Sequence, residues 1–228
     1  MILSLDNRLA LCADFVRRNS NLADIGTDHA YLPIRLALDH KIKSAVACDI
    51  RPLPLKNAQN NIELYGVEDI VSTLLSDGLD EVSPEAADDI VIAGMGGELI
   101  SKIISRTLWL RDKNKRLILQ PMTRADSLRL FLCQNGFEII NEKPCISLGK
   151  SYSVILAAFD GVIRPCDDIF KYTGLLQFDT SPESKSYISV INGKLKKKLN
   201  AFQKDSDEFH DLLELTKKLD SLSEEDEP

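Results

Sequence analysis

The chain has 228 residues, of which 44% are hydrophobic and 28% charged, and its formal net charge is −7; these are ordinary globular values that argue against a disordered chain. The apolar runs are too short to cross a bilayer, so we expect no membrane association. Five cysteines with no C-x-x-C pair and no visible signal peptide argue against a disulfide framework or a zinc site, so we expect a cytoplasmic protein without a metal.

Apolar spacing predicts that helices and strands alternate over the first 160 residues. The expected helices are 5–16, 31–40, 53–65, 98–106 and 123–135, and the expected strands are 21–25, 44–48, 70–75, 89–93, 116–119, 136–142 and 152–159. This alternation predicts an α/β fold with a mostly parallel sheet covered on both faces. The two consecutive strands at its end predict that the last strand is inserted antiparallel.

The pattern changes after residue 160. Apolar residues recur at steps of three and four over residues 182–202 and 209–219, which predicts a coiled-coil-like hairpin of two α-helices. This hairpin could clamp RNA, pair with a second subunit or brace the core. We expect two domains, 1–160 and 161–228, and a frayed acidic tail at residues 221–228.

Positive charge is concentrated in two places despite the acidic total. Residues 99–129 hold eight basic residues against two acids, and four lysines lie within residues 194–198. Such runs form either solvated helix faces or a phosphate-binding patch. The candidate RNA contacts are Lys102, Arg106, Arg111, Lys113, Lys115, Arg116, Arg124, Lys194 and Lys197.

Ligands of parallel α/β sheets bind at the carboxyl ends of the strands. The first strand ends in D-I-G-T-D-H-A-Y at residues 24–31, which lacks the G-x-G-x-x-G pattern of an NAD enzyme. Its acids, Asp24 and Asp28, suit a cationic or amine-bearing ligand. Asp49 ends the second strand, about 20 residues further on, where an acid commonly accepts hydrogen bonds from ribose hydroxyls.

The later strand ends add small and polar residues. Residues 76–78 read S-D-G, which forms either a simple turn or a place for an adenine ring with its amino group at Asp77. Residues 94–97 read G-M-G-G, and three glycines allow a close backbone approach to a ligand. Gln120 ends the fifth strand, where it either faces the site or bonds to backbone. Together these ends fit an adenosine bearing an amino acid, so S-adenosylmethionine suits them better than a nucleotide.

These motifs resemble those of the bacterial tRNA adenine-22 N1-methyltransferases. The matching segments are D-I-G-T-D-H-A-Y-L-P at 24–33, S-D-G at 76–78, A-G-M-G-G at 93–97 and L-Q-P at 119–121. Met122 departs from the family, in which Asn often follows Gln-Pro. The resemblance implies a Rossmann-like class I methyltransferase fold, S-adenosylmethionine as cofactor, and methyl transfer to N1 of adenine 22 in the D-arm of tRNA.

The resemblance also implies roles for individual residues. The expected cofactor-binding residues are Asp24, Gly26, Thr27, Asp28, His29, Asp49, Ile50, Ser76, Asp77, Gly78, Ala93, Gly94, Met95 and Gly96. The expected catalytic residues are Asp28, His29, Tyr31 and Met95, which would contact or orient the flipped adenine. Asp28 could instead bond loop amides, His29 could bind the cofactor carboxylate, and Tyr31 could only pack.

Two other functions stay open at this point. One is a methyltransferase that acts on another RNA, a protein or a small molecule. The other is an RNA-binding module that has lost activity, against which the intact set of strand-end acids and glycines argues. We expect a monomer or a weak dimer.

Overall fold

The computed structural model describes residues 3–223 of the chain. It contains one seven-stranded sheet in the order β3-β2-β1-β4-β5-β7-β6. Strands β1 to β5 pair in parallel, and β7 runs antiparallel to both of its neighbours, which confirms the prediction of an inserted last strand. The strands are β1 Ser20–Ile25, β2 Ile42–Asp49, β3 Val71–Leu75, β4 Asp89–Gly96, β5 Arg116–Thr123, β6 Phe137–Ser147 and β7 Lys150–Phe159.

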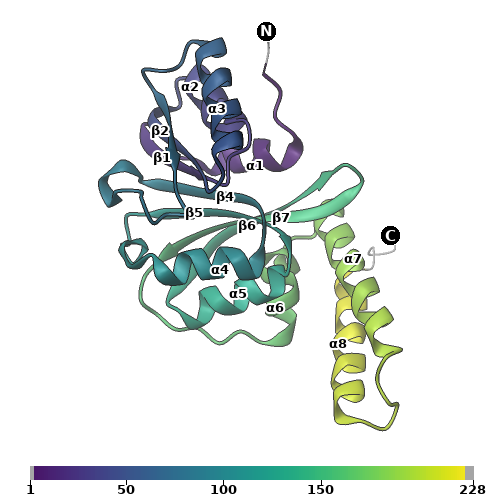
Figure 1. Cartoon of the computed structure of the whole chain (residues 1–228). Coiled ribbons are helices and arrows are strands. Elements are labelled where there is room, and N and C mark those ends of the chain that lie inside the picture. Colours follow the sequence, from purple (N-terminus) through teal and green to yellow (C-terminus); the bar gives the residue numbers. More distant parts are fainter. Residues whose placement is uncertain (1–2, 224–228) are drawn as a thin grey trace.

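Helices cover both faces of this sheet, as Figure 1 shows. The helices on one face are α1 Asn7–Phe15, α2 Tyr31–Leu38 and α3 Pro52–Tyr65, and those on the other are α4 Gly97–Arg106, α5 Ala125–Gln134 and α6 Asp168–Thr173. Successive residues of a strand point to opposite faces, so each central strand contributes side chains to a hydrophobic core on either side of the sheet. In β4, Val91 is buried in the first core, whereas Ile90 and Ile92 are buried in the second.

Most strands are longer than the hydrophobic pattern predicts, and β4 and β6 show why. β4 runs on to Gly96 because its glycines keep pairing with β5 across a register shift, where Gly96 lies opposite Thr123. β6 extends to Ser147 because its second half pairs with the start of β7 in a two-stranded antiparallel ribbon. A tight turn at Leu148 and Gly149, both with positive φ, closes this ribbon.

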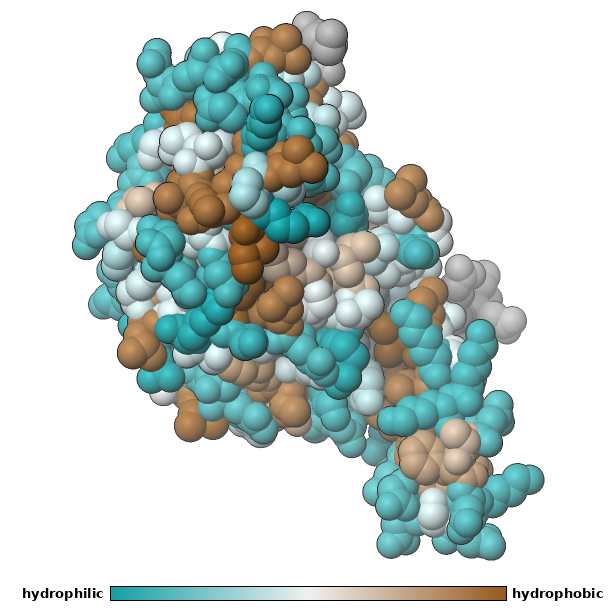
Figure 2. Space-filling model, viewed as in Figure 1, coloured by the Kyte–Doolittle hydropathy of each residue, from teal (hydrophilic) through white to brown (hydrophobic). Residues whose placement is uncertain are grey.

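The C-terminal part forms the predicted helical hairpin, with α7 Pro182–Leu199 and α8 Asp207–Ser223. A separate core holds it together, made by Leu176, Tyr187, Ile188, Leu195, Leu215 and Leu219. The helical hairpin projects from the carboxyl-end side of β4 and β5 (Figure 1). Hydrophobic side chains gather where it meets the sheet, and its outer surface is mostly hydrophilic (Figure 2).

The segment between β7 and α7 was not predicted to be ordered structure. It forms α6 and the short 3-10 helix Gly174–Phe178. The carbonyls of Lys171 and Tyr172 in this segment accept hydrogen bonds from Arg129 of α5, at 3.1 and 2.9 Å. A division into domains at residue 160 remains a prediction. The tail was expected to fray from residue 221, but residues 221–223 continue α8, and residues 224–228 lie outside the described part of the chain.

Candidate active site

A cavity of about 230 Å³ opens at the carboxyl ends of β1 and β4. The loop after β1 forms most of its wall and begins at Gly26, whose φ of +79° is a conformation that L side chains rarely adopt. The amides of Gly26 and Thr27 both donate to the carbonyl of Cys48 at 2.8 Å, which ties the loop to β2. The hydroxyl of Thr27 accepts the amide of Ala30 at 3.0 Å and fixes the entry to α2.

Asp24 is the buried charge of this cavity, with 7% of its surface exposed. Burial raises the pKa of its carboxyl group from 3.8 to about 6, although a hydrogen bond with Thr27 acts in the opposite direction. A cationic ligand would stabilise the ionised form and lower this pKa again. The site therefore favours a ligand with an ammonium group.

The end of β2 lies beside that of β1, and the end of β3 lies one strand further out. Asp49 is also buried, and its carboxylate accepts the amide of Arg51 at 2.8 Å. Ser76 closes the next turn, since its hydroxyl donates to the carbonyl of Gly78 and accepts the amide of Glu81. Ser76 therefore has a structural role in this turn.

Asp77 is exposed and pairs with the guanidinium of Arg106, which comes from the end of α4. The nitrogen–oxygen distance is 2.8 Å, and the hydrogen bond from Arg106 lowers the pKa of Asp77. Arg106 contacts Asp80 as well, at 3.1 Å. This predicted RNA contact is thus engaged by two carboxylates.

The glycine-rich end of β4 closes the cavity from the other side. Ala93 and Gly94 line it, and the Gly94 amide donates to Oε1 of Gln120 at 3.1 Å. The side chain of Met95 lies over Gly26, where an added Cβ would stand 2.2 Å from the methionine methyl group. Gly26 is therefore required for its backbone conformation, whereas the end of the flexible Met95 side chain could move aside.

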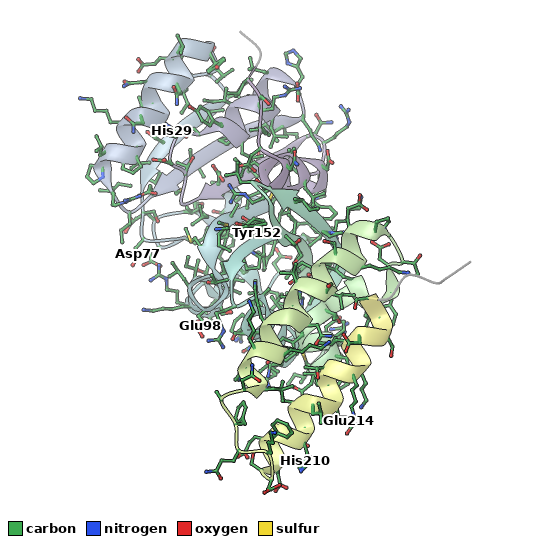
Figure 3. All side chains as sticks on the ribbon, turned by 90° about the vertical axis from the view of Figure 1, so that its right-hand side faces the viewer. His29, Asp77, Glu98, Tyr152, His210 and Glu214 are labelled. Atoms are coloured by element: carbon green, nitrogen blue, oxygen red, sulfur yellow. The ribbon has the colours of Figure 1, made fainter. Side chains whose placement is uncertain are left out.

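Asp28, His29 and Tyr31 form a cluster at the mouth of the cavity. The rings of His29 and Tyr31 stack with their centroids 5.1 Å apart, and Nε2 of His29 lies 3.2 Å from a carboxylate oxygen of Asp28. All three side chains are exposed or half-buried, and all three line the cavity. Figure 3, which faces this rim, labels His29 and Asp77 along one side of it.

Arg8 of α1 is a site residue that the sequence analysis missed. It lines the cavity, and its Nη1 lies 3.3 Å from Oε1 of Gln120 and 3.1 Å from Sδ of Met122. Its guanidinium carbon lies 5.7 Å from the centroid of the Tyr152 ring. These contacts join residues more than 110 positions apart, and the sequence around Arg8 carries no signal beyond a charge on an amphipathic helix.

The structure does not gather the predicted RNA contacts into one patch. Four of them flank the start of β5, at the sheet edge opposite the cavity: Arg111, Lys113, Lys115 and Arg116. Lys115 is turned inward, where its ammonium donates to the carbonyls of Pro84 and Ala87. Arg124 pairs with Glu98 at 2.7 Å, near the rim. Lys102, Lys194 and Lys197 are exposed.

Within residues 3–223, no group of three or more His, Cys, Asp or Glu side chains is arranged to hold a metal ion. No helix in the same range is both long and apolar enough to span a membrane.

The sheet order and a cavity between an acid-and-glycine loop and the end of the fourth strand define a class I methyltransferase domain. A family model described as a methyltransferase domain matches residues 5–155. The tRNA (adenine(22)-N(1))-methyltransferase of Bacillus subtilis is 36% identical over 167 residues, which cover 70% of each chain. This chain belongs to that family of tRNA methyltransferases.

Solved structures agree over nearly the whole chain. The crystal structure of the B. subtilis m1A22 tRNA methyltransferase TrmK has a TM-score of 0.83 at 27% identity and covers 98% of this chain and 100% of that one. M. capricolum TrmK in complex with S-adenosyl-homocysteine has a TM-score of 0.80 at 27% identity, with coverage of 95% and 96%. The matched region therefore includes the helical hairpin.

Proposed function

We propose that this chain transfers a methyl group from S-adenosylmethionine to N1 of adenine 22 in tRNA. The observation that carries the proposal is the match to the B. subtilis m1A22 tRNA methyltransferase over 98% of the chain, helical hairpin included. A methyltransferase of small molecules or proteins would share the sheet domain but would not require the same appendage.

The cavity suits this cofactor. Asp24 is a buried carboxylate that gains from an ammonium group, and Asp49 offers a second buried carboxylate at the neighbouring strand end for ribose hydroxyls. Asp77 lies one strand further on, where an adenine amino group would compete with Arg106. The cofactor supplies an electrophilic methyl group on a sulfonium.

The chain's own contribution is alignment and electrostatics. N1 of adenine carries an in-plane lone pair at neutral pH, so no proton has to be removed before attack. N1 lies on the Watson–Crick edge, so a paired adenine has to leave its stack. Gly94, whose Cβ position has nothing within 4 Å, leaves room for a flat ring at the rim, beside Met95. The stacked rings of His29 and Tyr31 orient it, and Asp28 offsets the positive charge that methylation creates.

The proposal has consequences for where and in what form the protein acts. A tRNA substrate and buried free thiols at Cys12, Cys48, Cys133 and Cys145 favour the cytoplasm. We further propose a monomer or a weak dimer, because the apolar seam of the helical hairpin is closed within the chain by residues such as Leu195 and Leu219.

The test is methyl transfer from labelled S-adenosylmethionine to unmodified bulk tRNA, followed by nucleoside analysis. We expect 1-methyladenosine, and we expect it to disappear when adenine 22 is replaced by guanine. An Asp24→Asn variant serves as the control with an impaired cofactor site. Cofactor binding without any labelled tRNA would instead favour a protein or small-molecule substrate.

A further inference from the structure

A second cavity lies between the sheet domain and the helical hairpin. We call it the junction pocket, a space of about 200 Å³ enclosed by the end of β5, the start of β7 and helix α7. Its walls include Arg124, Tyr152, Tyr172, Tyr187, Ile191 and Lys194. Figure 3 labels Tyr152 in the middle of the molecule, between the rim that carries His29 and the helical hairpin.

The junction pocket adjoins the glycine-rich rim but is distinct from the cofactor cavity. The two cavities share no lining residue. Thr123, which lines the pocket, lies opposite Gly96 in the β4–β5 pairing. Arg8 lines the cofactor cavity and lies over the ring of Tyr152, so one side chain forms part of the partition between the two.

The walls of the junction pocket combine flat rings with unused polar groups. Within residues 3–223, the hydroxyls of Tyr152 and Tyr172 make no hydrogen bond, whereas Tyr187 accepts one from Arg129 at 2.9 Å. Burial raises the pKa of Tyr172, which keeps its hydroxyl protonated as a donor. These rings therefore present both a stacking surface and polar groups to an occupant.

Lys194 adds a positive charge with no carboxylate partner in the described part of the chain. Its neighbour Lys196 is engaged instead, in a 2.7 Å ion pair with Asp220 of α8. Arg124 on the facing wall pairs with Glu98, which leaves Lys194 as the cation most available to an anionic group.

The floor of the pocket is held rigidly. Arg129 is fully buried and pairs with the equally buried Glu142 at 2.6 Å. The same guanidinium binds the hydroxyl of Tyr187 and the carbonyl of Tyr172, so two of the three tyrosines are anchored to one charged group. A preorganised wall of this kind binds a ligand without a large ordering cost.

We propose that the junction pocket receives the nucleotide next to the target adenine, with its base against Tyr152 and its phosphate at Lys194. This inference rests on the proposed function. When an adenine leaves its stack, the neighbouring base loses a stacking partner, and aromatic side chains replace such partners in complexes with unpaired RNA. The target base itself has to reach Ala93 and Gly94, which belong to the other cavity. The pocket is thus a separate subsite for a flanking nucleotide.

The test is a double-mutant cycle between the protein and the RNA. Dissociation constants are measured by fluorescence anisotropy for transcribed tRNA, in the presence of S-adenosylhomocysteine. The RNA is intact or abasic at position 21 or 23, and the protein is wild type, Tyr152→Leu or Tyr152→Phe. We expect Tyr152→Leu and one of the abasic changes each to weaken binding about five-fold or more, and the two together to weaken it no further. Tyr152→Phe should bind within two-fold of wild type.

A matched pair of lysines tests the phosphate contact. Lys194→Gln should weaken tRNA binding several-fold, whereas Lys217→Gln, an exposed lysine on α8 outside the pocket, should change it less than two-fold. Calorimetric affinity for S-adenosylmethionine should stay unchanged in both variants, which shows that the cofactor site is intact.

Failure of this inference differs from failure of the proposed function. If wild-type protein forms no 1-methyladenosine at position 22, the proposed function is wrong. If it does, but Tyr152→Leu binds tRNA like wild type or its effect adds fully to both abasic changes, the pocket does not hold a flanking nucleotide. Equal losses of affinity in Lys194→Gln and Lys217→Gln would likewise show that no phosphate binds in the pocket.

Discussion

The most informative single residue is Asp24, because its burial opposes its charge. Its pKa of about 6 in the folded protein lies above the ordinary 3.8, so folding favours the protonated form. The carboxyl group therefore penalises the ligand-free protein least below pH 3.8. Stability is lost as the pH rises from about 3.8 through 6, and the full penalty remains above that range. A cation in the cavity would offset the cost of burying the ionised carboxylate. The buried charge therefore lowers the stability of the ligand-free protein and raises its affinity for a cationic ligand.

Asp24→Asn should consequently stabilise the ligand-free protein at pH 8 by about 1–3 kcal/mol, and hardly at all near pH 4. The same variant should bind S-adenosylmethionine at least ten-fold more weakly. Urea unfolding at the two pH values and calorimetry provide the measurements. Asp28→Asn, which changes an exposed acid of the same loop, is the control and should gain less stability at pH 8 than Asp24→Asn, because it removes no buried charge. An Asp24→Asn protein less stable than wild type at pH 8 would contradict this account.

At the scale of elements, hydrophobic periodicity was sufficient to predict every strand of the sheet and the antiparallel insertion of β7. Periodicity is a local property, and glycines carry none, so the extension of β4 to Gly96 was not visible. The strand-end motifs were predictable because parallel strands bring their carboxyl ends to one edge. Arg8 was not, because its contact with Gln120 depends on the packing of α1 against β5. For the same reason, the sequence did not show that the basic residues at 99–129 would lie at both ends of the strands. These residues belong to a helix, a loop and a strand, which the fold places apart.

Gly97 shows how one element positions the site. It is the last glycine of the rim and the first residue of α4, and an added Cβ would stand 2.2 Å from the carbonyl oxygen of Arg124 at the start of α5. Gly97→Ala should lower the free energy of unfolding by about 1–3 kcal/mol and reduce kcat, because the rim has to move. Gly193 in α7 is the matched control, since nothing lies within 4 Å of its added Cβ. Gly193→Ala should raise the free energy of unfolding by roughly 0.5–1 kcal/mol. Unfolding curves that rank the two alanines equally would refute the steric argument.

At the scale of the whole molecule, one buried ion pair connects the sheet to the helical hairpin. Burial alone would lower the pKa of Arg129, but Glu142 and Tyr187 raise it above its usual value, so the guanidinium stays charged. Arg129 from α5 meets Glu142 from β6 and Tyr187 from α7. The orientation of the hairpin thus depends on a charge pair that neither element could bury alone.

Breaking this ion pair should therefore lower the stability of the protein and loosen the attachment of the helical hairpin. Arg129→Met leaves Glu142 buried and unpaired, and should lower the free energy of unfolding by about 3–5 kcal/mol. The double variant Arg129→Met with Glu142→Leu should be less destabilised than the sum of the single variants, because it leaves no isolated charge. Urea unfolding measures the cycle, and limited proteolysis of residues 160–180 reports whether the hairpin has come loose. Additive losses would show that the two residues act independently.

The distribution of free cations decides which side of the molecule faces RNA. Lys102 of α4 lies near enough to Asp77 to lower its pKa, and Lys194 of α7 lines the junction pocket. Arg111 and Lys113 instead precede β5, at the amino ends of the strands. Each phosphate contact that is lost reduces the slope of log affinity against log salt by about 0.7–0.9. The pair Lys102→Ala with Lys194→Ala should thus reduce the slope for tRNA by about 1.5.

The pair Arg111→Ala with Lys113→Ala removes the same amount of charge and should leave that slope nearly unchanged. Titrations at several salt concentrations compare the two double variants directly. If the opposite-edge pair changes the slope more, the RNA approaches the amino ends of the strands. The bound tRNA would then have to extend around the sheet for adenine 22 to reach the rim.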